Sequence, residues 1–163
     1  MKRHPGLHAL SQHHHFALTQ ALLMRRTAQA PATRRAAALR QAAQTFLRFW
    51  KKTGRLHFRE EEEVLLPAYA RHTRLDQDTA VMRMLAEHAQ IRAQIQQLET
   101  ALEAGPPAEE AVAALARTLH DHIRFEENEV FPRIEAALEE ADLLALSQRL
   151  TRLHAKNRCA IEA

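Results

Sequence analysis

The sequence predicts an all-α fold, an up-down antiparallel four-helix bundle followed by an additional C-terminal helix. Three observations lead to it. The chain has only 3 glycines and 6 prolines in 163 residues, and it is rich in the strong helix formers alanine, leucine, arginine, glutamate and glutamine. Apolar residues recur at helical spacing in several long segments. One histidine-glutamate motif occurs twice, and two copies of a two-helix unit form a bundle of four helices.

The first helix is predicted from about residue 5 to residue 27. It starts near Pro5, and proline is favoured at a helix start. His14 falls within the apolar stripe of this helix, whereas His13 and His15 are rotated by about 100° to either side of it. The sequence therefore predicts that His14 faces the core of the bundle.

The second helix is predicted from about residue 34 to Pro67, after a break at residues 30–33. Its apolar face includes Gly54 and, one turn later, His57. A glycine inside a helix costs roughly 1 kcal/mol relative to alanine. Gly54 therefore either lets a neighbouring helix or a metal site come close or marks a bend.

A run of four glutamates, residues 60–63, lies in this second helix. Runs of like charge are usually solvated, and we interpret Glu60 and Glu63 in that way. Glu61 differs because it falls on the apolar face, one helical turn after His57. The segment after Pro67, up to about residue 75, is predicted to be a turn.

The third helix is predicted over about residues 76–104, and His88 falls within its apolar stripe. A Gly-Pro-Pro sequence then separates it from the fourth helix. The fourth helix is predicted from about residue 108 to about residue 132, with His122 and Glu126 on its apolar face. These short connections predict antiparallel neighbours.

A fifth, amphipathic helix is predicted over about residues 142–160, with Asp142 as a candidate cap. It shows no pattern of metal ligands, so we interpret His154 and Cys159 as structural residues. The helix is expected to pack outside the bundle or against a second subunit, which makes a homo-oligomer through this helix an expectation.

The length suits a single domain spanning residues 1–163, with the bundle at about residues 5–137. The lone cysteine excludes an internal disulfide and suits a reducing compartment. Neither a secretory signal nor an apolar run of membrane length is visible, so we expect a cytoplasmic protein. The net charge of +3 is spread over arginines interleaved with glutamates, which argues against nucleic acid as a partner.

The strongest functional signal is the repeated motif. His57 is followed by glutamate at +4 and +5 and by proline at +10, and His122 is followed by the same residues at the same offsets. Each proline is expected to break the helix and so to end its motif. Residues four apart share one face of a helix, so Glu61 lies beside His57 and Glu126 beside His122. The second glutamate of each copy is rotated by about 100° and is expected to point elsewhere.

Six residues are predicted to converge inside the bundle as metal ligands. They are His14, His57, Glu61, His88, His122 and Glu126. Buried carboxylates are costly unless they are compensated, and metal ions supply that compensation. Six ligands are too many for one tetrahedral zinc and suit two ions, with each glutamate bridging both. Mixed nitrogen and oxygen ligands favour iron, with manganese or zinc as alternatives.

These six residues, together with Pro67 and Pro132, resemble the hemerythrin-like HHE cation-binding domain family over about residues 7–137. The resemblance implies an oxygen-bridged, non-haem di-iron centre that binds O2 or related small molecules. Oxygen-carrying members have a second histidine one turn after the third-helix ligand, where this chain has Arg92. They also have His-x4-Asp on the last helix, where this chain has His-x3-Glu.

Because of these departures, we expect a protein that binds or reacts with O2, peroxide or nitric oxide in redox chemistry, sensing or iron handling, rather than one that stores O2. The alternative is a regulatory or protein-interaction bundle whose metal or gas state alters a partner surface, and the fifth helix motivates it. A purely structural bundle without metal is the third reading.

Overall fold

The computed structural model describes residues 3–161, and the side chains of residues 3–155. The side chain of Cys159 therefore lies outside the described residues. The first long helix is α1 (His8–Arg26), which follows the 3-10 turn η1 (Pro5–Leu7) and precedes the 3-10 turn η2 (Thr27–Gln29). This segment agrees with the helix predicted from the first apolar stripe.

The second segment is one long helical run with two π-helical turns in it. It consists of α2 (Ala32–Phe49), η3 (Trp50–Gly54), α3 (Arg55–Glu60), η4 (Glu61–Leu65) and α4 (Leu66–Tyr69). The third consists of η5 (Leu75–Gln77) and α5 (Thr79–Ala104). The fourth consists of α6 (Glu109–Phe125), the π-helical turn η6 (Glu126–Val130) and α7 (Phe131–Ala137). The last helix is α8 (Glu140–Ile161).

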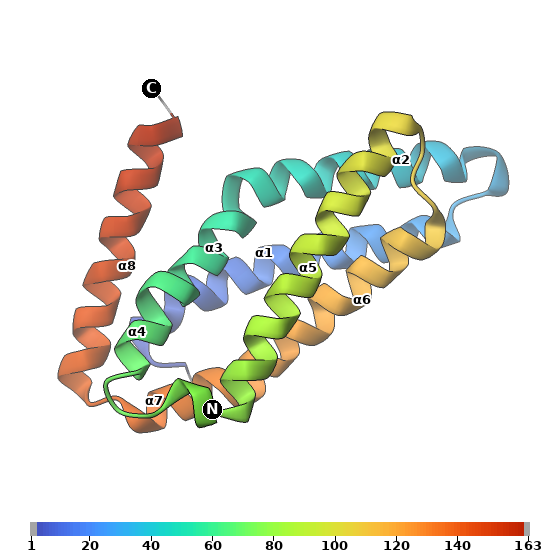
Figure 1. The fold of residues 1–163 in the computed structure, drawn as a ribbon. Helices are drawn as coiled ribbons and strands as arrows, with labels where there is room; N and C mark the ends of the chain where they lie inside the picture. The colour runs from blue at the N-terminus through green and yellow to red at the C-terminus, as the bar shows by residue number, and fades with distance from the viewer. Residues whose placement is uncertain (1–2, 162–163) are drawn as a thin grey trace.

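Within the described residues the fold is all-α, and the four segments run up and down as an antiparallel bundle (Figure 1). The predicted additional C-terminal helix is α8, which lies outside the bundle and packs on α3 and η4 (Figure 1). The start of α5 is later than predicted because Asp78 caps it, accepting hydrogen bonds from the amides of Ala80 at 2.9 Å and Val81 at 3.3 Å. None of the described helices combines the length and apolar character that crossing a membrane requires.

Asp142 does not cap α8 as predicted, because the helix already begins at Glu140. Its carboxylate instead contacts Arg71 at 2.7 Å and His72 at 2.9 Å. These pairs join the start of α8 to the turn that follows α4. His72, to which the sequence assigned no role, therefore takes part in a contact between α8 and the bundle.

The apolar core is divided into two clusters, and each of the four segments contributes to both. The first cluster includes Leu10, Val64, Met84 and Val130. The second includes Ala17, Phe58, Ile91 and Ile123. In each segment one residue of the predicted metal site, His14, Glu61, His88 or Glu126, falls between the two clusters in the sequence, and His57 and His122 lie next to Phe58 and Ile123 of the second cluster. A polar layer therefore crosses the middle of the bundle.

Pro67 and Pro132 do not end their helices, which corrects the prediction that each motif is closed by a helix-breaking proline. Both lie in the first turn of a new α-helix, α4 or α7, directly after a π-helical turn. Proline is tolerated in a first turn because its missing N–H is not needed there. The chain thus continues in helix to Tyr69 in one case and to Ala137 in the other.

Gly54 lies at the end of the π-helical turn η3, and its missing side chain makes room for an indole ring. A Cβ at this position would lie 2.3 Å from Cε3 of Trp50. Trp50 is itself buried and packs edge-on against Phe58 with ring centroids 5.1 Å apart. The group that comes close to Gly54 is therefore a ring of the same helical run, and not the neighbouring helix or metal site that the sequence suggested.

Candidate metal centre

The bundle brings the six predicted residues together in the polar layer. His14 lies on α1, His57 on α3, Glu61 at the start of η4, His88 on α5, His122 on α6 and Glu126 at the start of η6. All six are buried, and both carboxylates and His88 have no exposed surface at all. The centre therefore takes donors from all four segments of the bundle.

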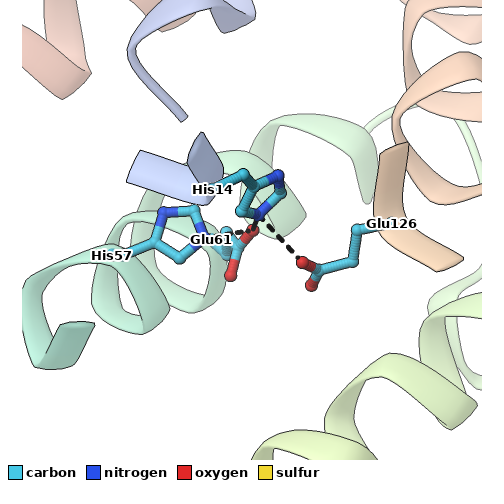
Figure 2. A group of neighbouring side chains, drawn as sticks. All are labelled: His14, His57, Glu61 and Glu126. Atoms are coloured by element: carbon cyan, nitrogen blue, oxygen red, sulfur yellow. Dashed lines mark ion pairs between the residues drawn. The ribbon is translucent and has the colours of Figure 1, made fainter. Parts of the chain in front are cut away.

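One half of the centre is formed by His14, His57 and the two glutamates (Figure 2). Nε2 of His14 lies 3.0 Å from Oε2 of Glu126 and 3.8 Å from Oε1 of Glu61. Nε2 of His57 lies 3.3 Å from that same oxygen of Glu61. The donor atoms of the four residues lie within 4.8 Å of one another, as ligands of one ion do.

The other half is formed by His88 and His122. Nε2 of His88 lies 3.3 Å from Oε2 of Glu61 and 3.4 Å from Oε1 of Glu126. Nε2 of His122 lies 3.1 Å from Oε1 of Glu126. Each carboxylate therefore presents one oxygen to each half of the centre. This is the arrangement that two bridging carboxylates between two ions require.

The inner atoms of this centre are close together without forming hydrogen bonds. Among the described residues, the four Nε2 atoms and all four carboxylate oxygens are buried and lack a hydrogen-bond partner. A buried polar group without a partner is costly, and a buried carboxylate is more so. Lone pairs that converge in this way fit a cation, so these side chains suit the metal ions that the sequence predicts.

In contrast to the Nε2 atoms, the Nδ1 atoms of three of these histidines are hydrogen-bonded to carboxylates. Glu127 accepts from Nδ1 of His14 at 2.6 Å, and Glu62 pairs with Nδ1 of His88 at 2.7 Å. Glu87 pairs with Nδ1 of His122 at 2.9 Å. Such contacts fix the ring and direct the lone pair of Nε2 inward. Glu62 and Glu127 are the second glutamates of the two motifs.

Sequence reasoning gave these three carboxylates no role. For two of them a signal was present, because the glutamate at +5 recurs in both motifs. Glu127 is itself held by Ser11 at 2.7 Å and by Arg3 at 2.7 Å. Glu87 precedes His88 directly, yet its partner is His122 on another helix, and only the packing of α5 against α6 reveals that.

Phenylalanine rings support two of the histidines. Phe58 stacks on His88 with ring centroids 3.7 Å apart, and Phe131 stacks on His14 at 5.2 Å. Arg92, where oxygen carriers have a histidine, points away from the centre. Its guanidinium lies 2.8 Å from Glu62, the carboxylate behind His88. Arg92 therefore acts on the centre through Glu62.

The charged groups of the centre shift one another's pKa values. Burial lowers the pKa of His14, but Glu126 and Glu127 outweigh burial and hold that pKa well above its ordinary value. Burial raises the pKa of Glu61, yet the surrounding imidazoles lower it to about 2. For His57 burial dominates and lowers the pKa to about 3, so this ring is a neutral donor.

Glu60 is buried, which corrects the prediction that Glu60 and Glu63 are both solvated; Glu63 is exposed as predicted. The side chain of Glu60 has no exposed surface and lies against two histidines to which the sequence assigned no functional role. Oε2 lies 3.1 Å from Nδ1 of His13, and Oε1 contacts Nε2 of His154. The periodicity of one helix did not reveal this burial, because α1 and α8 cover the flank that carries Glu60.

A small cavity of about 20 Å³ adjoins the centre. His14, His57 and His122 form one side of it, and Phe46, Trp50 and other apolar groups form the rest. One water molecule needs about 10–15 Å³, so the cavity admits a molecule of only two or three atoms. Its position gives such a molecule access to the histidines of both halves.

A family model described as the hemerythrin HHE cation binding domain matches residues 6–134. Neither the curated proteins nor the solved structures yielded a match. The matched range contains all six converging residues and both histidine-glutamate motifs, and it ends before α8. The chain belongs to the hemerythrin HHE cation-binding domain family.

Proposed function

We propose that His14, His57, Glu61, His88, His122 and Glu126 hold two iron ions, and that the protein binds or reacts with O2, peroxide or nitric oxide. One observation carries the proposal. Four imidazole nitrogens and four carboxylate oxygens face each other inside the bundle without hydrogen bonds, whereas the outer nitrogens of three of the rings are hydrogen-bonded. Manganese and zinc are the alternative ions.

The residues of the chain prepare the site for this chemistry. Three outer carboxylates orient their histidines, and the low pKa of His57 keeps its lone pair available. The apolar cavity excludes larger molecules and holds a small one beside His14, His57 and His122. Iron supplies redox chemistry and binding of diatomic molecules. This combination supports roles in redox reactions, sensing or iron handling.

The first experiment measures the metal. Protein produced in iron-supplemented cells is expected to contain about two irons per chain, because the donors form two groups that share Glu126. The oxidised protein is expected to develop a visible charge-transfer band when azide is added. A protein that stays colourless and metal-free after reconstitution with iron contradicts the proposal.

The second experiment compares two histidines of α6. His122→Ala removes a buried donor whose Nε2 lies 3.1 Å from Glu126, so the iron content should fall well below two per chain and the azide band should weaken. The matched control is His120→Ala, since His120 lies two residues earlier and pairs with Asp121 on the surface. Equal iron content in both variants excludes His122 as a ligand.

A second function, regulation of a partner, is favoured by the position of α8. This helix packs on α3 and η4, which carry His57 and Glu61. A structural change in these two segments on metal binding would therefore be transmitted to α8. If the surface of α8 reports the metal state, a partner should bind the iron-loaded and metal-free forms with different affinity. Binding that is unchanged after deletion of residues 142–163 contradicts this role.

A further inference from the structure

Glu60 forms a second buried cluster that the dinuclear centre does not use. Glu60 is the last residue of α3 and directly precedes Glu61, but its carboxylate contacts two other side chains, His13 on α1 and His154 on α8. Glu60 has no exposed surface, and neither of its oxygens has a hydrogen-bond partner in the described part of the chain. A fully buried carboxylate without hydrogen bonds needs compensation by positive charge.

The contacts of Glu60 have the same character as those of the dinuclear centre. Nδ1 of His13 lies 3.1 Å from Oε2 and Nε2 of His154 touches Oε1, yet neither contact has hydrogen-bond geometry. Both of these nitrogens are buried and otherwise unpartnered among the described side chains, although the edge of the His154 ring reaches solvent. Two imidazoles and a carboxylate thus direct lone pairs toward one another from three helices.

The spacing of the rings supports a shared ligand. The ring centroids of His13 and His154 are 5.1 Å apart. The rings that face each half of the dinuclear centre have similar separations, 4.6 Å between His14 and His57 and 4.9 Å between His88 and His122. The separation of the His13 and His154 rings is therefore similar to the separations of the histidine pairs in the proposed dinuclear centre.

His57 lies between the dinuclear centre and the cluster around Glu60 and is close to both. Its Nε2 faces Glu61, and Figure 2 shows the other ring nitrogen directed away from that carboxylate. The group around Glu60 whose donor atoms all lie within 4.8 Å of one another consists of His13, His57 and Glu60, and His154 adds its contact with Oε1 of Glu60. Among the four imidazoles of the dinuclear centre, His57 is the one whose Nδ1 has no carboxylate hydrogen-bonded to it in the described residues.

We propose that His13, Glu60 and His154 bind a third metal ion, a divalent ion of the zinc type, beside the dinuclear centre. Two histidines and one carboxylate with an open position form a familiar ligand set for zinc and for ferrous iron. His154 lies on α8, beyond the range of the family model, so the site adds to what the family domain provides. The ion would fasten α8 to the bundle at α1 and α3.

The test measures zinc uptake by the full chain after its dinuclear centre has been loaded with iron. Isothermal titration with Zn²⁺ is expected to show about one further equivalent in the wild type while the iron content of the same sample stays constant. Glu60→Gln and His154→Ala should each lower the affinity for this equivalent at least tenfold. His154→Ala changes a partly exposed residue, so it avoids the disturbance that a core substitution brings.

His120→Ala is the matched control, because it removes an exposed histidine that pairs with Asp121, and it should take up zinc as the wild type does. Absence of the further equivalent in the wild type overturns the inference. Full zinc affinity in His154→Ala also overturns it. The iron content of the same sample tests the dinuclear centre, and the zinc titration tests the third site. The two measurements therefore show which of the two proposals has failed.

Discussion

Three of the four converging imidazoles have a carboxylate hydrogen-bonded to Nδ1, so residues outside the predicted ligand set hold these rings in place. Glu127 is the best supported of the three, because Arg3 and Ser11 hold it in place. Its pKa is lowered to about 2, since His14, Arg3 and Ser11 outweigh the effect of its burial. It is therefore a charged acceptor throughout the neutral range.

Glu127→Gln is predicted to weaken metal binding without removing a ligand. The substitution takes away the charge that orients His14, and loss of such a partner lowers metal affinity by about 10–100-fold. Competition with a chelator measures the affinity. Glu129→Gln, on the exposed side of the same turn, is the control and should bind metal as the wild type does. An equal affinity in both variants contradicts the orienting role of Glu127.

Metal affinity is predicted to fall as the pH falls. Burial lowers the pKa of His14, His88 and His122, but the facing carboxylates outweigh burial and raise all three above 6.5, that of His88 to about 11. At neutral pH the metal-free centre therefore holds protons that an incoming ion must displace. Affinity for ferrous iron should decrease from about pH 8 to about pH 6, with proton release that calorimetry in different buffers detects. An affinity independent of pH contradicts this.

At this scale the sequence predicted the positions of the six converging residues, because four of them form His-x3-Glu pairs and two fall within apolar stripes. It could not predict the cluster at Glu60. On a regular helix Glu60 lies on the flank of the ligand face, and its burial depends on where α8 packs. His154 gave no signal either, because a single histidine on an amphipathic helix has no spacing that indicates a contact.

Two of the four segments that carry the predicted ligands, the second and the fourth, contain π-helical turns, and such turns often mark functional sites. Glu61 and Glu126 each begin one, so the backbone changes its winding at the two buried carboxylates. A prediction based on one period of 3.6 residues cannot anticipate this change. It predicted breaks at Pro67 and Pro132, whereas each π-helical turn lets the helix resume at the proline.

Gly54→Ala is predicted to destabilise the protein, although alanine is the better helix former. The new Cβ would lie 2.3 Å from Cε3 of Trp50, a buried ring that cannot move away freely. Such overpacking costs about 1–3 kcal/mol and outweighs the gain of about 1 kcal/mol in helix propensity. Urea unfolding measures the change, with the neighbouring Thr53→Ala as control. A more stable Gly54→Ala variant would show that the ring is free to shift.

For the whole molecule, the polar layer between the two apolar clusters links metal binding to folding stability. Metal that binds only the folded chain adds about 2.7 kcal/mol at a free concentration one hundred times the Kd. For a protein of this size the melting temperature should then rise by roughly 5–10 °C. Scanning calorimetry under nitrogen, with and without ferrous iron, measures it. His122→Ala should show a smaller rise, and a wild-type rise no larger than that of the variant contradicts the link.

The division of the interior also determines how the bundle can open. Leu10 and Ala17 belong to different clusters although they lie on one helix, and the other three segments are divided in the same way. A metal ion bound between the two clusters would connect all four helical segments at mid-length. With the ion bound, opening one end of the bundle would strain the other end, and after its release each end could open independently.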